Sequence, residues 1–569
     1  MRLTSRFTSQ LLIATASLTV LAQQPAPMPK APAVPGLSPA AEHAMGSIDP
    51  ERIRAHVRFL SHDLLEGRGT GQRGGDIAAQ YLATQFALLG LAPAGDDNTF
   101  LQKVPLVALT TLPATTFELD TKNGQRMDLR RNDDYVATDQ SAEPEASIDA
   151  PIVFVGYGIN APEYHWNDYA GLDVKGKVVL MFVNEPPSPQ PSTDDNFFKG
   201  RALTYYGRWT YKYEEAARQG AVGAILIHQP QMASYPWEVV RNSWGGESSE
   251  LRDNSAPKLK VASWIQFEIA RKLFADSGLD IDKLMEQMRQ PGFKAIPLGA
   301  SLKAKIATKV RPFDGWNVVA RLDGGAPNDL RDQAVLYTAH YDHLGIHPDQ
   351  PGDNIYNGAD DNATGCAILL EIARAFANSV AKPARSMLFA SVTAEEQGLL
   401  GSAYLGLHPP VPANDIVLDL NFDDIAPTGL PQELVVSGSE RTDFYPTVVD
   451  VAKSFGMNIR PDSFPEAGHY YRSDHFSLAR VGIPSFSVGE GLKFEGHDVA
   501  WGDARAKDYT EHRYHQPSDE YRPDMDFRAD ARIAQVGFAL GWKAASNRQK
   551  IDWKPGDEFA RARQLSESH

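Results

Sequence analysis

The 569-residue chain has a single cysteine, no apolar run long enough to span a membrane, and fewer basic than acidic side chains. Because Cys366 stands alone, no disulfide can form within the chain. The longest apolar stretch, from Leu11 to Ala22, falls short of the roughly 20 residues of a membrane-spanning helix. With 56 basic and 72 acidic residues the net charge is −16, which repels phosphate backbones and argues against nucleic acid as a partner.

What the sequence does contain is typical of a globular protein. Hydrophobic residues make up 42% and charged residues 22% of the chain, which excludes collagen, coiled coil and wholesale disorder. The length predicts at least two compact units.

The first 22 residues have the pattern of a secretory signal peptide. Arg2 and Arg6 precede the apolar stretch that ends at Ala22, a small residue of the kind at which signal peptidase cuts. We therefore predict an exported protein, periplasmic or secreted, with no membrane span after signal removal. Residues 23–48 are rich in Pro and Ala and are predicted to form an unstructured tether.

The remaining chain is predicted to form an α/β domain interrupted by a β-rich unit. Residues 49–141, with two helices before position 90, would be the N-terminal part of the α/β domain. Residues 142–300 carry short apolar strands between loops rich in Gly, Pro and Asn, as in an inserted β-rich unit. Residues 301–548 would be the main part of the domain, and residues 549–569 a C-terminal tail.

The main part alternates apolar strands with helices. The expected strands are 335–339, 387–392, 416–422 and 485–488, and the expected helices are 363–377 and 444–455. This order predicts an α/β fold with a mixed, mostly parallel sheet flanked by helices.

Histidine and carboxylate side chains follow the predicted strands, where such sheets bind their ligands. The segments are Ala339-His340-Tyr341-Asp342-His343, Gly358-Ala359-Asp360-Asp361-Asn362, Thr393-Ala394-Glu395-Glu396, Asn421-Phe422-Asp423-Asp424 and Tyr514-His515-Gln516-Pro517-Ser518-Asp519. Taken alone, a histidine of this kind is more often a core residue, and a pair of acidic residues is more often a solvated turn. The joint occurrence of these segments at one edge of the sheet, however, predicts a shared metal site.

The ligand types indicate which metal this site would take. Imidazole with carboxylate and without thiolate suits Zn²⁺, with Mn²⁺ or Co²⁺ as alternatives. Calcium is disfavoured because it prefers an all-oxygen shell. The ligands outnumber the three that one catalytic zinc requires, so two ions fit better.

These motifs, together with Ser473-Asp474-His475, resemble those of the co-catalytic zinc aminopeptidases of peptidase family M28. The β-rich unit resembles a protease-associated domain. The resemblance implies a zinc-peptidase-like fold and two Zn²⁺ ions, with Asp360 bridging both. His340 and Asp423 would complete one site, and Glu396 and His515 the other.

The resemblance also implies roles for residues that do not bind metal. Glu395 would be the general base that activates a metal-bridging water, and Asp342 would hold the imidazole of His340. Tyr470 would steady the tetrahedral intermediate, with Tyr471 as the alternative.

The expected function is therefore that of an exported metal-dependent exopeptidase, an aminopeptidase that acts on peptide or protein N-termini. Three alternatives stay open: a carboxypeptidase-type relative, an aminoacyl-cyclase relative and a non-catalytic, receptor-like binding module. The sequence does not give the oligomeric state.

One further segment has two interpretations. The Arg- and Tyr-rich residues 201–213 are predicted either to line the interface of the β-rich unit or to be a solvated helix face.

Overall fold

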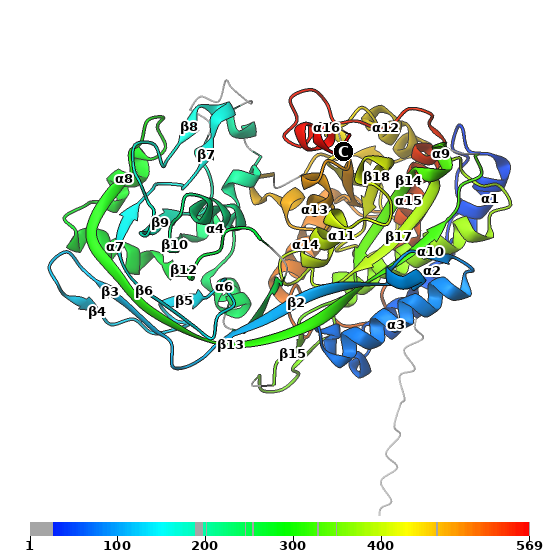
Figure 1. Cartoon of the computed structure of the whole chain (residues 1–569). Helices are drawn as coiled ribbons and strands as arrows, with labels where there is room; N and C mark the ends of the chain where they lie inside the picture. Colours follow the sequence, from blue (N-terminus) through cyan, green and yellow to red (C-terminus); the bar gives the residue numbers. More distant parts are fainter. Residues whose placement is uncertain are drawn as a thin grey trace, which may run out of the picture.

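The computed structural model describes residues 27–187, 197–200, 202–244, 246–252, 255–326, 329–348, 350–462 and 465–567. Two lobes lie side by side, and the long strand β13 (Ile296–Leu322) runs from one into the other (Figure 1). The first half of β13 pairs with β3 (Thr116–Asp120) and β6 (Glu145–Phe154) in the β-rich lobe. Its second half pairs with β2 (Leu101–Thr111) and β17 (Ser386–Val392) in the α/β lobe. A single continuous strand thus belongs to both sheets.

The α/β lobe is built on a sheet with a parallel centre. Strand β14 (Ala334–His340) lies between β17 (Ser386–Val392) and β18 (Ile416–Asn421), and β21 (Ser485–Glu490) pairs with β18, all in parallel. Every residue of β14, β17 and β18 is buried, as expected of strands covered by helices on both faces. Antiparallel β13 and β19 (Glu433–Ser437) extend this sheet. The predicted mixed, mostly parallel sheet is confirmed.

Helix α10 (Thr364–Asn378) and helix α15 (Arg528–Ser546) are almost fully buried in the largest core cluster. Cys366 lies in the first turn of α10, where it is buried and its thiol donates to the carbonyl oxygen of His340 at 3.2 Å. Burial raises the pKa of this thiol to about 12. Cys366 is therefore a buried residue of the core.

The tether prediction is wrong for the described residues from Val34 onward. Helix α1 (Pro39–Gly46) begins directly after Ser38, whose hydroxyl accepts a hydrogen bond from the amide of Ala41. Ala41, Met45 and Val34 are at most 1% exposed and belong to the main core cluster. The side-chain cap stabilises the start of this helix, and two apolar residues one helical turn apart pack it into the core. The segment is therefore ordered despite its Pro- and Ala-rich composition. The predicted signal peptide, residues 1–22, lies outside the described residues.

The chain's C-terminal segment is also packed against the α/β lobe. The indole of Trp553 donates to the carbonyl of Gly482 at 2.9 Å. Helix α16 (Ala560–Glu567) follows, and its Arg563 is only 2% exposed. Much of the predicted tail is therefore structured.

The β-rich lobe has its own sheet and two core clusters. Strands β6 (Glu145–Phe154), β9 (Val178–Phe182), β10 (Gly223–His228) and β12 (Val261–Gln266) pair in parallel in that order. Strand β5 (Tyr135–Thr138) pairs antiparallel with β12. Strands β3 (Thr116–Asp120) and β4 (Arg126–Met127) also belong to this sheet. The sheet therefore extends N-terminal to the boundary predicted at residue 142.

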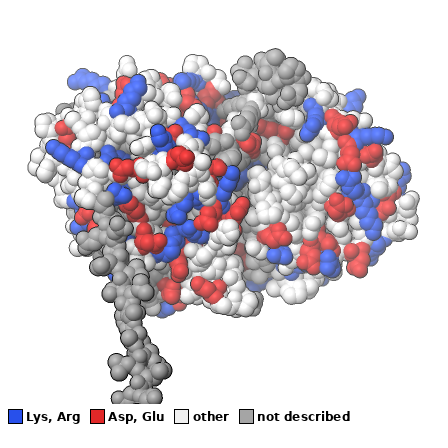
Figure 2. Space-filling view, turned by 180° about the vertical axis from the view of Figure 1, so that it is seen from behind, with Lys and Arg blue, Asp and Glu red and all other residues white. Residues whose placement is uncertain are grey.

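The surface carries both signs of charge. Figure 2 shows Lys and Arg side chains interspersed with Asp and Glu side chains over one face of the molecule. Within the described part of the chain, no helix combines the length and apolar character needed to cross a membrane.

Candidate metal centre

The candidate site lies where the parallel strands of the α/β lobe end. His340 is the last residue of β14, Glu396 follows β17, and Asp423 follows β18. Asp361 comes from the turn η6 (Ala359–Ala363) before α10, and His515 comes from the segment that precedes α15. The parallel arrangement brings these distant segments to one edge of the sheet, as the sequence predicted.

Several of the loops at the site have unusual backbone conformations. Ala394, Asp424 and His515 have positive φ angles of 55°, 56° and 56°. Such conformations cost about 1 to 3 kcal/mol in non-glycine residues, and they cluster at functional sites. Each of these residues is a site residue or directly adjoins one.

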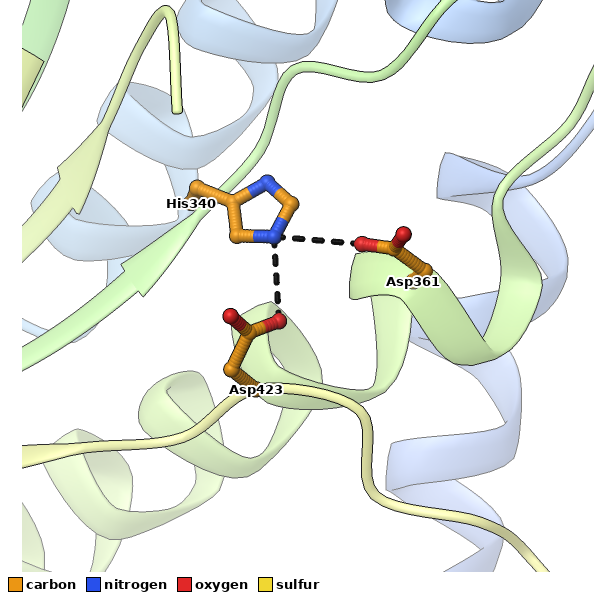
Figure 3. Close-up of side chains that lie close together, drawn as sticks. All are labelled: His340, Asp361 and Asp423. Atoms are coloured by element: carbon orange, nitrogen blue, oxygen red, sulfur yellow. Dashed lines mark hydrogen bonds and ion pairs between the residues drawn. The ribbon is translucent and has the colours of Figure 1, made fainter. Parts of the chain in front are cut away.

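The first half of the site is a buried histidine between two aspartates. The Nε2 atom of His340 lies 3.0 Å from Oδ1 of Asp423 and 3.2 Å from Oδ1 of Asp361. Figure 3 shows the imidazole of His340 facing both carboxylates. The His340 side chain is 1% exposed, so these charges face one another in a largely dry environment.

The second half shares Asp361 with the first. The Nε2 atom of His515 lies 3.3 Å from Oδ2 of Asp361 and 3.1 Å from Oε2 of Glu396. His343, which had no predicted role, also belongs here because its Nδ1 lies 2.6 Å from Oε1 of Glu396. The two carboxylate oxygens of Asp361 therefore face different histidines.

These distances are those of ligand atoms around a divalent metal ion. Zinc bound to nitrogen and oxygen at about 2.0 to 2.1 Å in tetrahedral geometry holds its ligand atoms about 3.3 Å apart. The four separations in the two halves, 3.0, 3.2, 3.1 and 3.3 Å, lie at or just below that value. His340, Asp361 and Asp423 form one group of potential ligands, and His343, Asp361 and Glu396 form another.

The aspartate that faces both His340 and His515 is Asp361, one residue further along the chain than Asp360, which the resemblance predicted for this place. Asp360 is also buried, but its amide donates to Oδ1 of Asp519 at 3.0 Å, and burial together with Asp519 raises the pKa of its carboxyl well above the usual range. Its Oδ1 has no hydrogen-bond partner among the described residues. In a pair of adjacent aspartates the turn decides which side chain faces the strand ends, and the sequence alone does not show the turn.

Asp342 contacts the imidazole of His340 through its backbone rather than through its side chain. The Nδ1 atom of His340 lies 3.1 Å from the carbonyl oxygen of Asp342 but 3.8 Å from its carboxylate. That carboxylate instead accepts from the hydroxyl of Thr70 at 2.8 Å and from the amide of Glu395 at 3.1 Å. Burial raises the pKa of Asp342 to about 6. Asp342 thus orients the loop that carries Glu395 as well as the imidazole.

Arg68 fixes two of the loops that carry site residues. It ends the turn η1 (Asp63–Arg68) and is completely buried. Its guanidinium donates four hydrogen bonds of 2.6 to 2.8 Å to main-chain carbonyls, those of Leu60, Tyr341, Asn357 and Gly358. Tyr341 adjoins His340, and Gly358 begins the turn that holds Asp361, so the geometry of both depends on this side chain.

Glu395 stands beside the potential ligands without belonging to either group. Burial raises the pKa of its carboxyl well above the usual range; His340 opposes this shift, and the neighbouring Glu396 and Asp423 add to it. A carboxyl group in this setting holds a proton readily, which suits proton transfer.

The structure does not bring the predicted tyrosine to the site. The hydroxyl of Tyr470 donates to the carbonyl of Ser485 at 3.2 Å, and the hydroxyl of Tyr471 donates to Glu558 at 2.9 Å. Both rings belong to an aromatic cluster with Phe476. The role predicted for Tyr470, with Tyr471 as its alternative, therefore finds no support in this geometry, because packing of the rings directs both hydroxyls elsewhere.

Two contributors had no predicted role. His343 and Asp519 stand within the motifs around His340 and His515, yet only the folded loops show that His343 contacts Glu396 and that Asp519 accepts from the amides of Asp360 and Asp361. The signal for His343 was its place directly after Asp342, three residues beyond the end of a buried strand.

Comparisons with known proteins find similarity to peptidases. Residues 317–540 match the family model described as Peptidase family M28. Leupeptin-inactivating enzyme 1 of Streptomyces exfoliatus is 28% identical over 232 residues, 40% of this chain and 48% of that protein. Aminopeptidase NAALADL1 of Rattus norvegicus is 25% identical over 426 residues, 63% of this chain and 51% of that protein. The chain thus aligns with about half the length of these relatives.

Similarity to a solved structure extends over most of both chains. An aminopeptidase from Aneurinibacillus sp. strain AM-1 has a TM-score of 0.51 and 18% identity, with 91% of this chain and 98% of that chain covered. This similarity supports the fold class predicted from the sequence.

Proposed function

Because residues 317–540 belong to peptidase family M28, as the sequence motifs predicted, we propose that this protein is a zinc-dependent exopeptidase that removes residues from the N-termini of peptides. The observation that carries the proposal is the shared aspartate. The two oxygens of Asp361 lie 3.2 and 3.3 Å from His340 and His515, which is the arrangement two co-catalytic ions require.

The metal ligands would divide into two sets. His340, Asp423 and Asp361 would hold one Zn²⁺, and His515, Glu396 and Asp361 the other, with Mn²⁺ or Co²⁺ as possible replacements. His343 would orient Glu396 from outside the ligand shell, since its Nδ1 lies 2.6 Å from that carboxylate. When bound, the two ions supply Lewis acidity, which acidifies water and polarises the scissile carbonyl.

Glu395 would move the proton. It adjoins the ligand Glu396 but lies outside both ligand groups, so its carboxylate is free to accept a proton from water and pass it to the leaving amine. A positioned general base of this kind contributes about 10²- to 10⁴-fold to the rate. The amide of Glu395 donates to Asp342 at 3.1 Å, which fixes the base relative to His340.

The proposed action at the amino terminus of the substrate is supported by the rat relative, which is named an aminopeptidase. A non-catalytic binding module would not need the complete ligand set together with a free carboxylate beside it. The carboxypeptidase and cyclase alternatives are separated from the proposal by the substrates described below.

We also propose that the protein is exported and that its inserted lobe is a protease-associated domain. Export rests on the signal-peptide pattern of residues 1–22. The interpretation of residues 142–300 as a protease-associated domain rests on their β-rich texture and their position between the two parts of the α/β domain.

The test compares peptides with free and acetylated amino termini, using wild type and Glu395→Gln. We expect cleavage of the free peptides only. The variant should keep about two zinc ions per chain, measured by mass spectrometry of the metal, while its kcat falls by roughly 10²-fold or more. Equal rates on free and acetylated peptides would exclude an aminopeptidase, and a variant with nearly full activity would exclude Glu395 as the base.

A further inference from the structure

An exposed carboxylate stands directly beside the candidate metal centre. Asp424 follows the potential ligand Asp423 in the chain, so their Cα atoms lie about 3.8 Å apart, yet Asp424 belongs to neither group of potential ligands. Asp424 is exposed, whereas the side chain of Asp423 is only 12% exposed. Within the described residues, the side chain of Asp424 has one hydrogen bond and no ion pair. The hydroxyl of Tyr509 donates that bond to Oδ1 at 3.2 Å.

Two tyrosine rings connect Asp424 to the other half of the centre. Tyr509 lies on helix α14 (Val499–His512), and its ring centroid lies 6.1 Å from that of Tyr514. The ring of Tyr514 is stacked on the imidazole of His515, with 4.0 Å between centroids, and Tyr514 is 38% exposed. A continuous row of contacts therefore runs from Asp424 through two aromatic rings to His515. This row presents a carboxylate and accessible aromatic surface together.

The charges of the metal-loaded centre leave the carboxylate of Asp424 in surplus. Two divalent ions carry four positive charges, and four carboxylates balance them, namely those of Asp361, Glu395, Glu396 and Asp423. Asp424 adds one more negative charge. The basic side chain next to Tyr514 does not cancel it, because Arg513 is paired with Asp508 at 2.9 Å. An exposed carboxylate in such surroundings attracts a cation from the solvent.

We propose that Asp424 recognises the basic side chain of an N-terminal Lys or Arg, so that the enzyme prefers peptides that begin with these residues. The inference rests on the proposed function and narrows its substrate class. The carbonyl of the first residue must reach the metal ions, so the side chain of that residue begins at the centre. The alkyl stem of Lys or Arg packs well on aromatic rings such as that of Tyr514. Its charged end then pairs with a carboxylate.

The α-amino group of the substrate is a second cation that a carboxylate can bind, and the contacts favour the side chain. The α-amino group is attached to the carbon next to the scissile carbonyl, so it stays close to the metal ligands. Asp424 instead directs Oδ1 toward Tyr509 of helix α14, which is exposed over most of its length. An exposed helix lies at the outside of the centre, where the end of a long side chain arrives.

The experiment measures kcat/KM for the p-nitroanilides of lysine and norleucine, which share the same alkyl stem and differ in the charged amino group. We expect wild type to prefer lysine by at least about 10-fold. Asp424→Asn should lower the lysine value about 10- to 100-fold, the effect of losing a hydrogen bond between charged groups. It should change the norleucine value less than about threefold and keep the zinc content of wild type, since Asp424 lies outside both ligand groups. Tyr509→Phe, which frees the carboxylate, should lower the lysine value about fivefold.

Glu511→Gln is the matched control, because it removes a negative charge from the helix that carries Tyr509. Glu511 is exposed and lies about 200° around the helix from Tyr509, so both substrates should stay within about twofold of wild type. A loss for lysine equal to that of Asp424→Asn would overturn the inference.

Three further results would overturn it. They are equal kcat/KM for lysine and norleucine in wild type, equal losses for both substrates in Asp424→Asn, and loss of zinc from that variant. All of these results leave the proposed function standing, because wild type still cleaves substrates with a free amino terminus. Failure of wild type to cleave either substrate would overturn both.

Discussion

Replacing Asp361 by Asn should remove both metal ions, whereas the same change in Asp360 should remove neither. The carboxylate of Asp361 faces His340 at 3.2 Å with one oxygen and His515 at 3.3 Å with the other. In Asp361→Asn one of these oxygens becomes an NH₂ group, which cannot bind a cation. Loss of a mere outer partner costs about 10- to 100-fold in metal affinity. Loss of a shared ligand should therefore cost at least about 100-fold, or ~2.7 kcal/mol.

The assay is zinc content after dialysis against a graded series of chelator concentrations. Wild type and Asp360→Asn should both retain about two ions per chain to a similar chelator concentration. Asp361→Asn should release them at a concentration at least about 100-fold lower. If Asp360→Asn loses the metal and Asp361→Asn retains it, the geometry described for the turn η6 is wrong and the assignment from the sequence motif is right.

Two further changes test buried polar groups of the α/β lobe. Arg68→Met removes a guanidinium that donates four buried hydrogen bonds, so we expect destabilisation by at least about 3 kcal/mol; a melting temperature within one degree of wild type would contradict this. His56 lies 2.8 Å from the hydroxyl of Tyr81, and burial lowers the pKa of its imidazole to about 4. Because the unfolded chain takes up this proton near pH 6.5 and the folded chain does not, stability should fall between pH 6.5 and 4, by up to about 3 kcal/mol. His56→Gln should remove that part of the pH dependence of urea unfolding, and an unchanged pH profile would contradict the assignment.

The sequence predicted the parts of the fold that burial determines. Strands such as β14 and β17 are runs of apolar residues buried on both faces, and their limits agree with the expected ranges to within two residues. The same runs located His340, Glu396 and Asp423, which lie at the ends of buried strands or within four residues of them.

Prediction was less accurate where a turn or a packing contact sets the direction of a side chain. The choice between Asp360 and Asp361 depends on the conformation of η6, which no local pattern specifies. Tyr470 stands near the correct motif, but its ring packs into an aromatic cluster and takes the hydroxyl away from the metal centre. The segment around Met45 resembled a linker in composition, although its apolar residues are spaced to pack as a helix.

The lone cysteine has a practical consequence. With its thiol buried in α10 and its pKa raised to about 12, Cys366 should be nearly inert to maleimides at neutral pH. A cysteine engineered on the surface of each lobe would then accept a fluorophore or spin label without any native residue being removed. The separation of the lobes could be followed in solution by resonance energy transfer during turnover.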